Sequence, residues 1–206
     1  VDGFEVGAGR VDAVATSEGR IPCASVAIAG GAWSTASAEA LGARLPVAPQ
    51  RGQIVHLQWH DASPGDWPMV AGLRDHYLVP WRDGRVVAGA TRETGSGFAP
   101  ETTAAGLREV FDQALDLAPG LAAATFVEVR VGLRPLSADG APILGRLPGF
   151  ENVWVATGHG PAGLMLGPYS GRVVAAAIAA SDDTAIPPRL RPERFASALP
   201  ADADGR

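Results

Sequence analysis

Polar and apolar residues alternate along several short segments of this chain, with the period of two that is typical of β-strands. Residues 11–16 alternate in this way, and a turn at residues 17–20 leads into the continuous apolar run 24–29, which predicts a buried strand. Residues 53–59 alternate again, as expected for a half-buried antiparallel strand. The early part of the chain is therefore expected to be rich in strands.

Residues 77–81 and 85–91 form the strongest local signal in the sequence. Both runs favour strand, and Arg82, Asp83 and Gly84 separate them. Asp-Gly between two such runs is typical of a β-hairpin turn, because both residues tolerate positive φ. We therefore expect the two runs to pair antiparallel.

Helical periodicity begins in two places that have recognisable boundaries. A short helix is expected over residues 35–43, after a pair of glycines. Apolar residues at helical spacing then predict a helix that begins after Thr102 or Thr103 and stops at Pro119. Those apolar residues are Leu107, Val110, Phe111, Ala114 and Leu115.

The last part of the chain has the pattern of strand, loop and helix. Residues 125–133 and 152–157 favour strand, and an alanine-rich helix is expected to follow a glycine loop and to end near Ala180. From Ser181 the composition changes to Pro, Asp, Arg and Ala, which predicts a surface-bound or disordered tail. The order of elements predicts a mixed α/β fold in which one domain is inserted between two pieces of another.

The composition limits the classes of function. With 206 residues, 47% of them hydrophobic, the chain can bury a substantial core. Its net charge of -5 and the lack of a basic run argue against a nucleic-acid partner. Cys23 is the single cysteine, which excludes an internal disulfide and predicts a reducing compartment, the cytoplasm. Residues 173–180 are far shorter than the ~20 residues of a membrane span, so no span is expected.

A glycine-rich loop is the first candidate for chemistry. Gly158 to Gly163 match G-x-G-x-x-G between a predicted strand and a predicted helix. In a dinucleotide-binding fold a second parallel strand follows that helix, whereas here a proline-rich tail follows, so we reject a dinucleotide fingerprint. The loop can still place backbone N–H groups at a helix amino terminus, which favours a negatively charged group. A plain tight turn remains the alternative.

Arg134 is the second candidate, because it ends an apolar strand and precedes a proline. A guanidinium group matches a carboxylate in two parallel hydrogen bonds, so an arginine in this place can anchor an amino acid. On spacing alone, a surface ion pair is the better interpretation. The sequence identifies no catalytic acid or base, predicts no metal site and sets no oligomeric state.

Five motifs occur in the order found in the D-amino-acid oxidase superfamily. The chain, as far as about Ala180, resembles its branch of glycine oxidases, sarcosine oxidases and D-amino-acid dehydrogenases. The motifs are residues 29–34, residues 49–53, residues 77–80 with 89–91, residues 132–135 with Asp139, Gly140 and Pro142, and residues 158–160 with Gly163 and Leu164. Five motifs in the right order are far more specific than any one of them.

The resemblance implies a FAD-binding domain that is interrupted by a substrate domain with a mostly antiparallel mixed sheet. The expected parts are 1–45 and 134–180 for the FAD-binding domain, 46–133 for the substrate domain, and 181–206 for the tail. The amino-terminal dinucleotide-binding βαβ segment of the family would precede Val1. The chain is therefore expected to be a fragment or a processed chain, with that missing segment as its partner.

The resemblance also implies roles for individual residues. Arg134 matches an arginine that binds the substrate carboxylate, and Tyr77 matches a tyrosine that hydrogen-bonds the same group. From its own pattern, Tyr77 would be a half-buried aromatic residue of a strand. Flavin contacts are implied for the glycine loop, namely His159, Gly160, Pro161, Ala162, Gly163, Leu164 and Met165.

Two positions depart from the glycine oxidase pattern. Pro161 stands where that enzyme has a second arginine, and Arg92 stands where it has a methionine. Arg92 is therefore a candidate for the replacement cation, or else a solvated side chain at the end of a hairpin. Sarcosine oxidases attach flavin through a cysteine in the stretch that matches residues 131–145, where this chain has none, so FAD is expected to bind non-covalently.

The implied activity is the oxidation of an amino acid or secondary amine, of the glycine, sarcosine or D-amino acid type. A hydride passes to the flavin, and the resulting imine hydrolyses to a keto acid. The alternative is a non-catalytic substrate-binding or assembly module derived from the same family.

Overall fold

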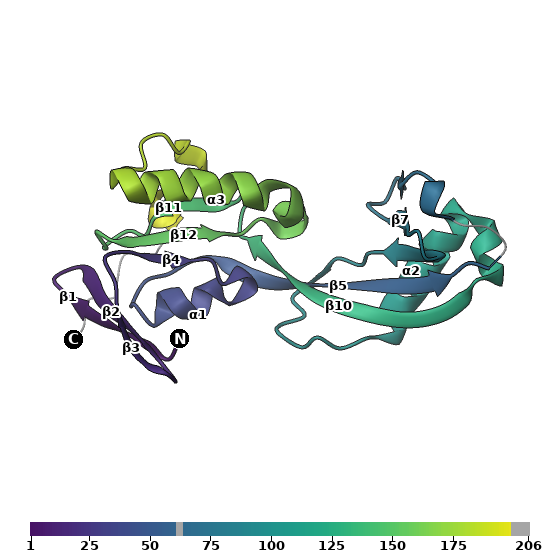
Figure 1. The fold of residues 1–206 in the computed structure, drawn as a ribbon, viewed down its shortest axis with the longest axis horizontal. Helices are drawn as coiled ribbons and strands as arrows, with labels where there is room; N and C mark the ends of the chain where they lie inside the picture. Colours follow the sequence, from purple (N-terminus) through teal and green to yellow (C-terminus); the bar gives the residue numbers. More distant parts are fainter. Residues whose placement is uncertain (61–63, 199–206) are drawn as a thin grey trace. The chain divides into compact units, whose positions relative to one another are not determined.

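The computed structural model describes residues 1–60 and 64–198, and the chain divides into two compact units. Unit 1 comprises Val1–Ala48 with Arg134–Arg206, and unit 2 comprises Pro49–Leu133. Two long strands, β5 (Val47–Gln58) and β10 (Thr125–Ser137), contain the points at which the chain passes between the units (Figure 1).

An antiparallel meander opens unit 1. It consists of β1 (Gly3–Gly7), β2 (Arg10–Thr16) and β3 (Gly19–Pro22). The strand predicted at residues 11–16 is confirmed as β2. The turn predicted at residues 17–20 is shorter, because Gly19 and Arg20 already belong to β3 and pair with β2. Val11 and Ala13 are fully buried, so one face of β2 contributes to the core, as its alternation predicts.

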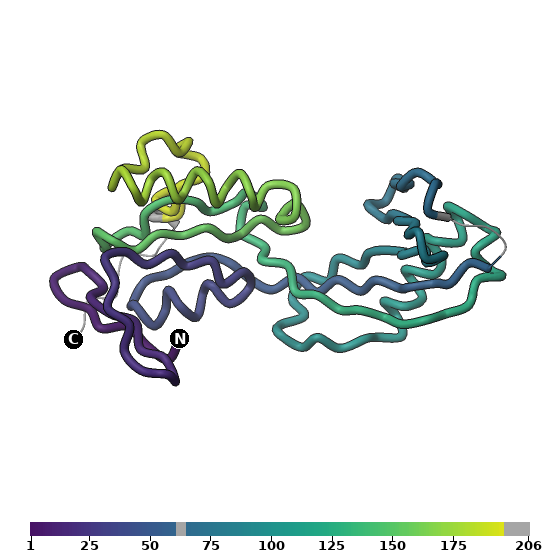
Figure 2. The backbone as a smooth tube through the Cα atoms, viewed as in Figure 1, coloured from purple at the N-terminus to yellow at the C-terminus, as the bar shows by residue number. Residues whose placement is uncertain are grey.

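A second sheet and two helices complete the architecture of unit 1. Strand β12 (Val153–Thr157) lies between β11 (Ile143–Arg146), which is antiparallel to it, and β4 (Val26–Ile28), which is parallel. A 3-10 turn at Gly31–Trp33 leads from β4 into α1 (Ser34–Glu39), which ends earlier than predicted. A second 3-10 turn at Gly160–Ala162 leads from β12 into α3 (Gly163–Ala180), which lies along this sheet (Figure 2).

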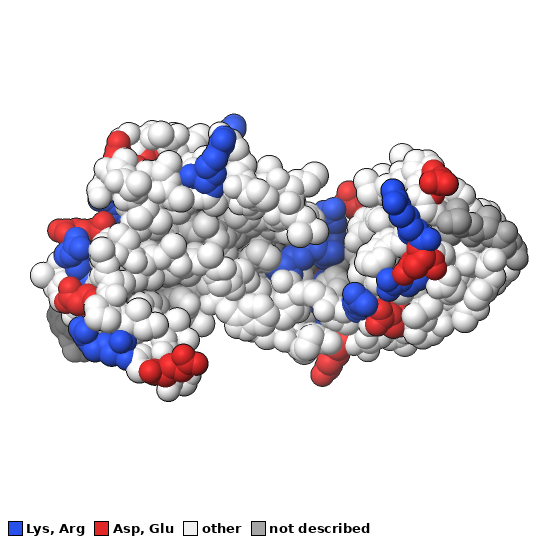
Figure 3. All heavy atoms as spheres, in the orientation of Figure 1, with Lys and Arg blue, Asp and Glu red and all other residues white. Residues whose placement is uncertain are grey.

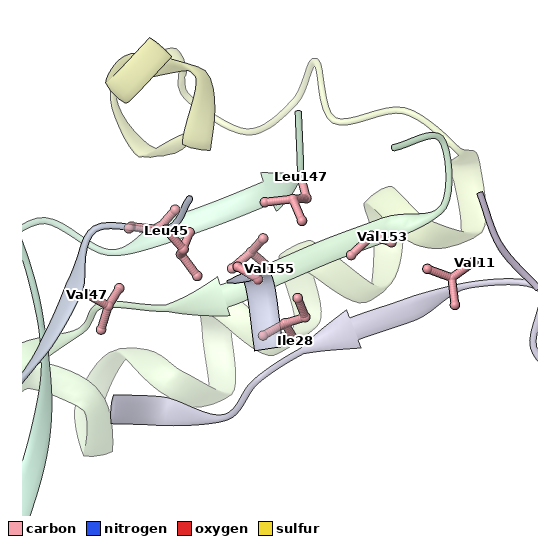
Figure 4. Packing of buried hydrophobic residues seen from close by; sticks show 9 residues of the cluster. Val11, Ile28, Leu45, Val47, Leu147, Val153 and Val155 are labelled. Carbon is pink, nitrogen blue, oxygen red and sulfur yellow. The ribbon is translucent and has the colours of Figure 1, made fainter. Parts of the chain in front are cut away.

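Both faces of this sheet carry buried apolar side chains. Trp154 of β12 packs against Val174 and Ala177 of α3, and it is 1% exposed. The opposite face forms a separate cluster, in which strands of both sheets and the start of β5 meet (Figure 4). Its labelled residues are Val11, Ile28, Leu45, Val47, Leu147, Val153 and Val155. Full burial of one such side chain contributes about 1.5–3 kcal/mol to the free energy of folding. The cluster therefore holds β4 against β12.

The prediction of a buried strand at residues 24–29 is wrong in extent and in burial. Only Val26–Ile28 form β4, and Ala24, Ala27 and Ala29 are exposed. Among the described residues β4 pairs with β12 alone, so its other edge has no neighbouring strand. A continuous apolar run is typical of a parallel strand that is covered on both faces, and in this chain that cover is incomplete.

Unit 2 is a sheet in the order β10-β5-β8-β7-β6, with one face packed against a helix. The predicted hairpin is confirmed as β7 (Tyr77–Pro80) and β8 (Arg85–Gly89), which pair antiparallel. Two short strands, β6 (Val70–Ala71) and β9 (Glu93–Thr94), pair with β7 and β5. Strand β5 is longer than its predicted segment, because it begins in unit 1.

The predicted helix of unit 2 is confirmed as α2 (Ala104–Leu117). Thr103 is its N-cap, since the threonine side chain accepts a hydrogen bond from the backbone N–H of Gly106. Val110 and Ala114 are buried against β5, β7 and β8, through Val55, Leu78 and Ala88. Short 3-10 turns at Pro64–Asp66 and Pro119–Ala123 complete the unit.

The tail is bound to the surface of unit 1 as far as residue 198. Helix α3 ends at Ala180, and two 3-10 segments follow at Pro188–Leu190 and Pro192–Ala198. Ile186 is fully buried against the cluster of Trp154, and Arg194 binds Asp139 with nitrogen-to-oxygen distances of 2.7 and 2.9 Å. The remainder of the predicted tail, 199–206, lies outside the described residues.

The Arg194–Asp139 pair predicts a pH dependence of stability. Hydrogen bonds from Arg194 are the main reason that the pKa of Asp139 falls from 3.8 to about 2. A depressed folded-state pKa stabilises the fold above the unfolded pKa, and this contribution is lost as the pH falls from 3.8 through about 2. In this window the unfolding free energy of the wild type is expected to fall more steeply than that of Asp139→Asn. Denaturant titrations at each pH measure the difference, and parallel curves for the two proteins contradict it.

Residues 160–180 correct the expectation about membrane spans. This helix, with its preceding turn, is long and apolar enough to cross a bilayer by length and composition alone. The sequence prediction considered only the apolar stretch near its end, whereas glycine, alanine and proline residues extend the segment. One face of α3 packs on β11 and β12 through Trp154 and Leu144, while most of the segment is exposed in this chain.

Candidate functional site

Two glycine turns meet at one edge of the small sheet of unit 1. Strands β4 and β12 are parallel, with Val26 opposite Val153 and Ile28 opposite Val155, so their carboxyl ends lie at the same edge. Gly31 follows β4 with φ of 56°, and Gly158 follows β12 with φ of 75°. In open α/β sheets, ligands bind outside the carboxyl ends of the strands.

Hydrogen bonds join the two turns. The Thr157 hydroxyl donates to the carbonyl oxygen of Gly31 at 3.0 Å, and the Ser34 hydroxyl donates to Thr157 Oγ1 at 3.0 Å. Ser34 and Thr157 are both buried. The start of α1 and the loop before α3 are therefore held together by buried side chains at the base of the turns.

Gly158 occupies a position that is strained for any residue with a side chain. A Cβ atom there would lie 3.0 Å from Ser137 Cβ and 3.2 Å from Ile143 Cγ1. The positive φ of this residue adds a conformational cost for any other L-residue. The close approach of β10, β11 and the loop thus depends on the missing side chain.

His159 is held by α3. Its Nε2 atom and Ser170 Oγ share a hydrogen bond of 2.9 Å, and Ser170 is buried. Burial lowers the pKa of His159 below its ordinary value, so the imidazole is neutral near pH 7. Ser170 was not predicted as a partner of His159, because nothing in an alanine-rich helical segment marks one serine as a hydrogen-bond partner.

The first turn of α3 presents apolar side chains to solvent. Leu164 is 96% exposed and Met165 is 79% exposed, and Trp33 beside the other glycine turn is 56% exposed. The helix amino terminus favours negative charge, while these side chains favour a flat apolar group. The residues present therefore fit a ligand that is both aromatic and anionic, as a flavin is.

Arg134 belongs to unit 1, and the strand that carries it is bridged to the glycine loop. It is half-buried in β10, and two residues further on Leu136 forms an antiparallel bridge with His159. The structure thus brings the predicted carboxylate-binding arginine close to the loop predicted to contact flavin. Spacing alone had favoured a surface ion pair for Arg134, and it gave no indication of this pairing.

Tyr77 lies across a glycine on the sheet of unit 2. Gly89 pairs with Tyr77 on one side and with Ile54 on the other. A Cβ atom at Gly89 would lie 2.8 Å from the Tyr77 hydroxyl and 2.7 Å from Ile54 Cγ2. Since Leu78 and Ala88 face α2, the alternation of the strands places Tyr77 on the opposite face of the sheet.

Arg92 lies at the same end of the hairpin as Tyr77. It follows β8, and its Nη2 atom is 3.3 Å from Asp75 Oδ1, just before β7. The Arg92 side chain is 44% exposed, and acidic and basic side chains adjoin one another over this unit (Figure 3, right). The structure therefore brings Tyr77 and Arg92 together within unit 2, and Arg134 and the glycine loop together within unit 1.

A buried polar network beside Arg92 was missed from the sequence. Arg51 donates two hydrogen bonds to Glu93, and Gln53 and Thr91 donate to the other carboxylate oxygen at 2.6 Å each. Burial raises the pKa of Glu93, but the hydrogen bonds from Thr91, Gln53 and Arg51 outweigh it and lower the pKa below its ordinary value. Residues 49–53 form one of the five motifs of the resemblance. Only the fold shows that Arg51 and Gln53 of this motif bind Glu93 in the segment after β8.

The chain belongs to the family described as FAD dependent oxidoreductase (DAO), whose model matches residues 1–177. It is 38% identical over 168 residues to the uncharacterized oxidoreductase YurR of Bacillus subtilis, covering 81% of this chain and 45% of that protein. It is 35% identical over 170 residues to glycine oxidase of Pseudomonas putida, covering 82% of this chain and 46% of that protein. The predicted resemblance to the glycine oxidase branch is confirmed.

Solved structures give the same result. The iminodiacetate oxidase of Chelativorans has a TM-score of 0.85 with 38% identity, covering 92% of this chain and 52% of that one. Glycine oxidase of Bacillus cereus has a TM-score of 0.78 with 28% identity, covering 88% and 50%. The mixed α/β fold with antiparallel sheets is confirmed, and the chain spans about half the length of the relatives it matches.

Proposed function

We propose that this chain provides the substrate-binding part and the carboxyl-terminal flavin contacts of a FAD-dependent amine or amino acid oxidoreductase, acting in the cytoplasm. The observation that carries the proposal is the pairing of β10 with the loop after β12, which places Arg134 two residues from the bridge to His159. The substrate class is that of glycine, sarcosine and D-amino acids. The similarity to a protein named iminodiacetate oxidase supports the inclusion of secondary amines.

Arg134 and Tyr77 orient the substrate in this proposal. The Arg134 guanidinium of unit 1 binds the substrate carboxylate in two parallel hydrogen bonds, and Tyr77 of unit 2 keeps the carboxylate-binding role that the resemblance implies. Both groups act by holding the carbon that bears the amine in a fixed orientation. This positioning lowers the entropy lost on reaching the transition state. No side chain is assigned as a base, because an amine that binds in its neutral form needs none.

The residues that would hold FAD lie in the loop and in the first turn of α3. When bound, FAD accepts the hydride from the substrate. The backbone of residues 160–165 and the amino terminus of α3 stabilise negative charge on the bound flavin. His159 holds the loop against Ser170 as a neutral imidazole. The lack of a cysteine in residues 131–145 favours non-covalent binding.

A further polypeptide segment is needed for this function. Strand β4 has one unpaired edge among the described residues, and Ala27 in this strand and Ala29 after it are exposed. Leu164, Met165 and Tyr169 of α3 are also exposed. These features support a partner segment that adds to the edge of β4, covers α3 and binds the dinucleotide part of FAD.

The alternative is a substrate-binding or assembly module without catalysis. The two functions differ in whether a flavin is reduced by substrate in any form of the protein.

The visible absorption spectrum distinguishes the two functions. The chain alone is expected to be colourless, and the chain joined to the amino-terminal half of a glycine oxidase is expected to carry a flavin band. Anaerobic addition of glycine, sarcosine and D-amino acids should bleach that band. A protein that binds flavin but is bleached by none of them supports the non-catalytic module, and a protein that binds no flavin contradicts the proposed function.

A further inference from the structure

Two arginines lie at the Tyr77 end of the unit 2 sheet, and they differ in their surroundings. Arg51 is 12% exposed and binds Glu93 at 2.7 and 2.9 Å, within a network that includes Gln53. Arg92 is 44% exposed, and its ion pair to Asp75 has a distance of 3.3 Å. Arg51 is therefore held by Glu93 within the fold. Arg92 lies on the segment after β8, and its charge is exposed on the surface.

The partner of Arg92 is easily displaced. Asp75 is 67% exposed, and it lies in an exposed turn with φ of 62°, two residues before Tyr77. Exposed ion pairs contribute little net stability, because solvent screens them and side-chain entropy opposes them. Asp75 can therefore turn to solvent while another carboxylate takes its place on Arg92.

The backbone keeps Arg92 near the end of β8 that pairs with Tyr77. Tyr77 pairs with Gly89, three residues before Arg92, and the half-buried Glu93 follows Arg92 directly. The network of Glu93 with Arg51 and Thr91 anchors this segment on β5. The backbone of Arg92 is thus fixed at the end of the sheet where Tyr77 lies. The carboxylate that pairs with it, Asp75, can be exchanged for another.

Resting on the proposed function, we propose that Arg92 binds a second acidic group of the substrate. The preferred substrates are then amines with two acidic groups, one of which Arg92 binds at the Tyr77 end of the unit 2 sheet. Asp75 occupies Arg92 in the absence of substrate and competes with the second carboxylate. A guanidinium group at this position is complementary to a diacid, whereas a monocarboxylate leaves it without a substrate partner.

Matched ligands test this role without turnover. Oxydiacetate and methoxyacetate are unreactive ethers that differ by one carboxylate, and each is titrated into the flavin-loaded protein while the visible flavin band is followed. The wild type is expected to prefer oxydiacetate, and Arg92→Met is expected to reduce this preference by roughly 10- to 100-fold. Asp75→Asn is expected to strengthen oxydiacetate binding, and Arg92→Lys should retain part of the preference.

Two arginines serve as matched controls. Arg108→Met removes an arginine from an exposed pair with Asp112 on α2, and Arg74→Met removes one beside Asp75 in sequence. Both variants should keep the wild-type preference. Equal binding of the two ethers by the wild type, or the same loss of preference in Arg74→Met as in Arg92→Met, overturns the role of Arg92.

Turnover separates this inference from the proposed function. Iminodiacetate should reduce the flavin with higher kcat/KM than sarcosine, and D-aspartate with higher kcat/KM than D-alanine. If sarcosine and D-alanine reduce the flavin as well as the diacids do, the role of Arg92 fails and the proposed function stands. If no amine in the panel reduces the flavin, the proposed function itself fails.

Discussion

Replacing Arg134 by alanine in the flavin-loaded protein is expected to lower kcat/KM for the amino acid substrate by roughly 100- to 1000-fold. The substrate carboxylate would lose a charged partner in a partly desolvated place, and removal of one side of such a pair costs about 2–5 kcal/mol. Arg134 is half-buried in β10, two residues before the bridge of Leu136 to His159. Steady-state kinetics with the best substrate of the panel measures the loss.

Arg130→Ala is the matched control on the same strand. Arg130 is 55% exposed and binds Glu128 of β10 at 2.6 Å, so its loss is expected to change kcat/KM less than threefold, or ~0.6 kcal/mol. Arg134→Lys keeps the charge but loses the two parallel hydrogen bonds, and an intermediate loss is expected. Wild-type kcat/KM in Arg134→Ala, with flavin content unchanged, rules out the assignment of Arg134 to the substrate.

Replacing Gly158 by valine is expected to destabilise unit 1 by about 3 kcal/mol or more and to weaken flavin binding. The residue has φ of 75°, and a Cβ atom would lie 3.0 Å from Ser137 Cβ. A β-branched side chain meets both the strained backbone and the neighbouring strand. Hydrogen exchange of the β12 amides reports the stability of unit 1, and flavin retention after gel filtration reports the site.

Gly171→Ala is a control that is expected to stabilise unit 1, whereas Gly158→Val is expected to destabilise it. Gly171 lies within α3, is exposed, and a Cβ atom there would have no neighbour within 4 Å. Alanine in a helix is more favourable than glycine by up to ~1 kcal/mol, so protection of unit 1 should be kept or increased. Equal protection of β12 in Gly158→Val and in the wild type contradicts the argument from close approach.

Local elements were predictable because their signals lie within a few residues. The hairpin of β7 and β8 follows from Asp83 and Gly84 between two strand-forming runs. Helix α2 follows from apolar residues at helical spacing and from a start at Thr102 or Thr103, of which the structure shows Thr103 as the N-cap. Turn and cap preferences are properties of the backbone, so they act in the same way whatever the tertiary context.

The candidate site could be predicted only as a set of separate residues. The glycine loop and Arg134 were identified from the sequence. The conformational freedom of glycine and the geometry of a guanidinium group are properties of the residue type alone. Their relation depends on the bridge from Leu136 to His159, which joins residues distant in the sequence. The Arg51–Glu93 network and the Ser170 partner of His159 were missed for the same reason.

Burial is where the sequence and the structure differ most. The apolar run 24–29 fixes a strand preference, but Ala27 and Ala29 are exposed because β4 has only one neighbouring strand among the described residues. The polar composition after Ser181 suggested a surface-bound or disordered tail, and the structure buries Ile186 and ties Arg194 to Asp139. The sequence by itself determined β2, the hairpin of β7 and β8, helix α2 and the family of this protein, since these depend on local propensity and on motifs. Only the tertiary structure decided which of those surfaces are covered and which polar groups meet, because burial and pairing depend on contacts between distant segments.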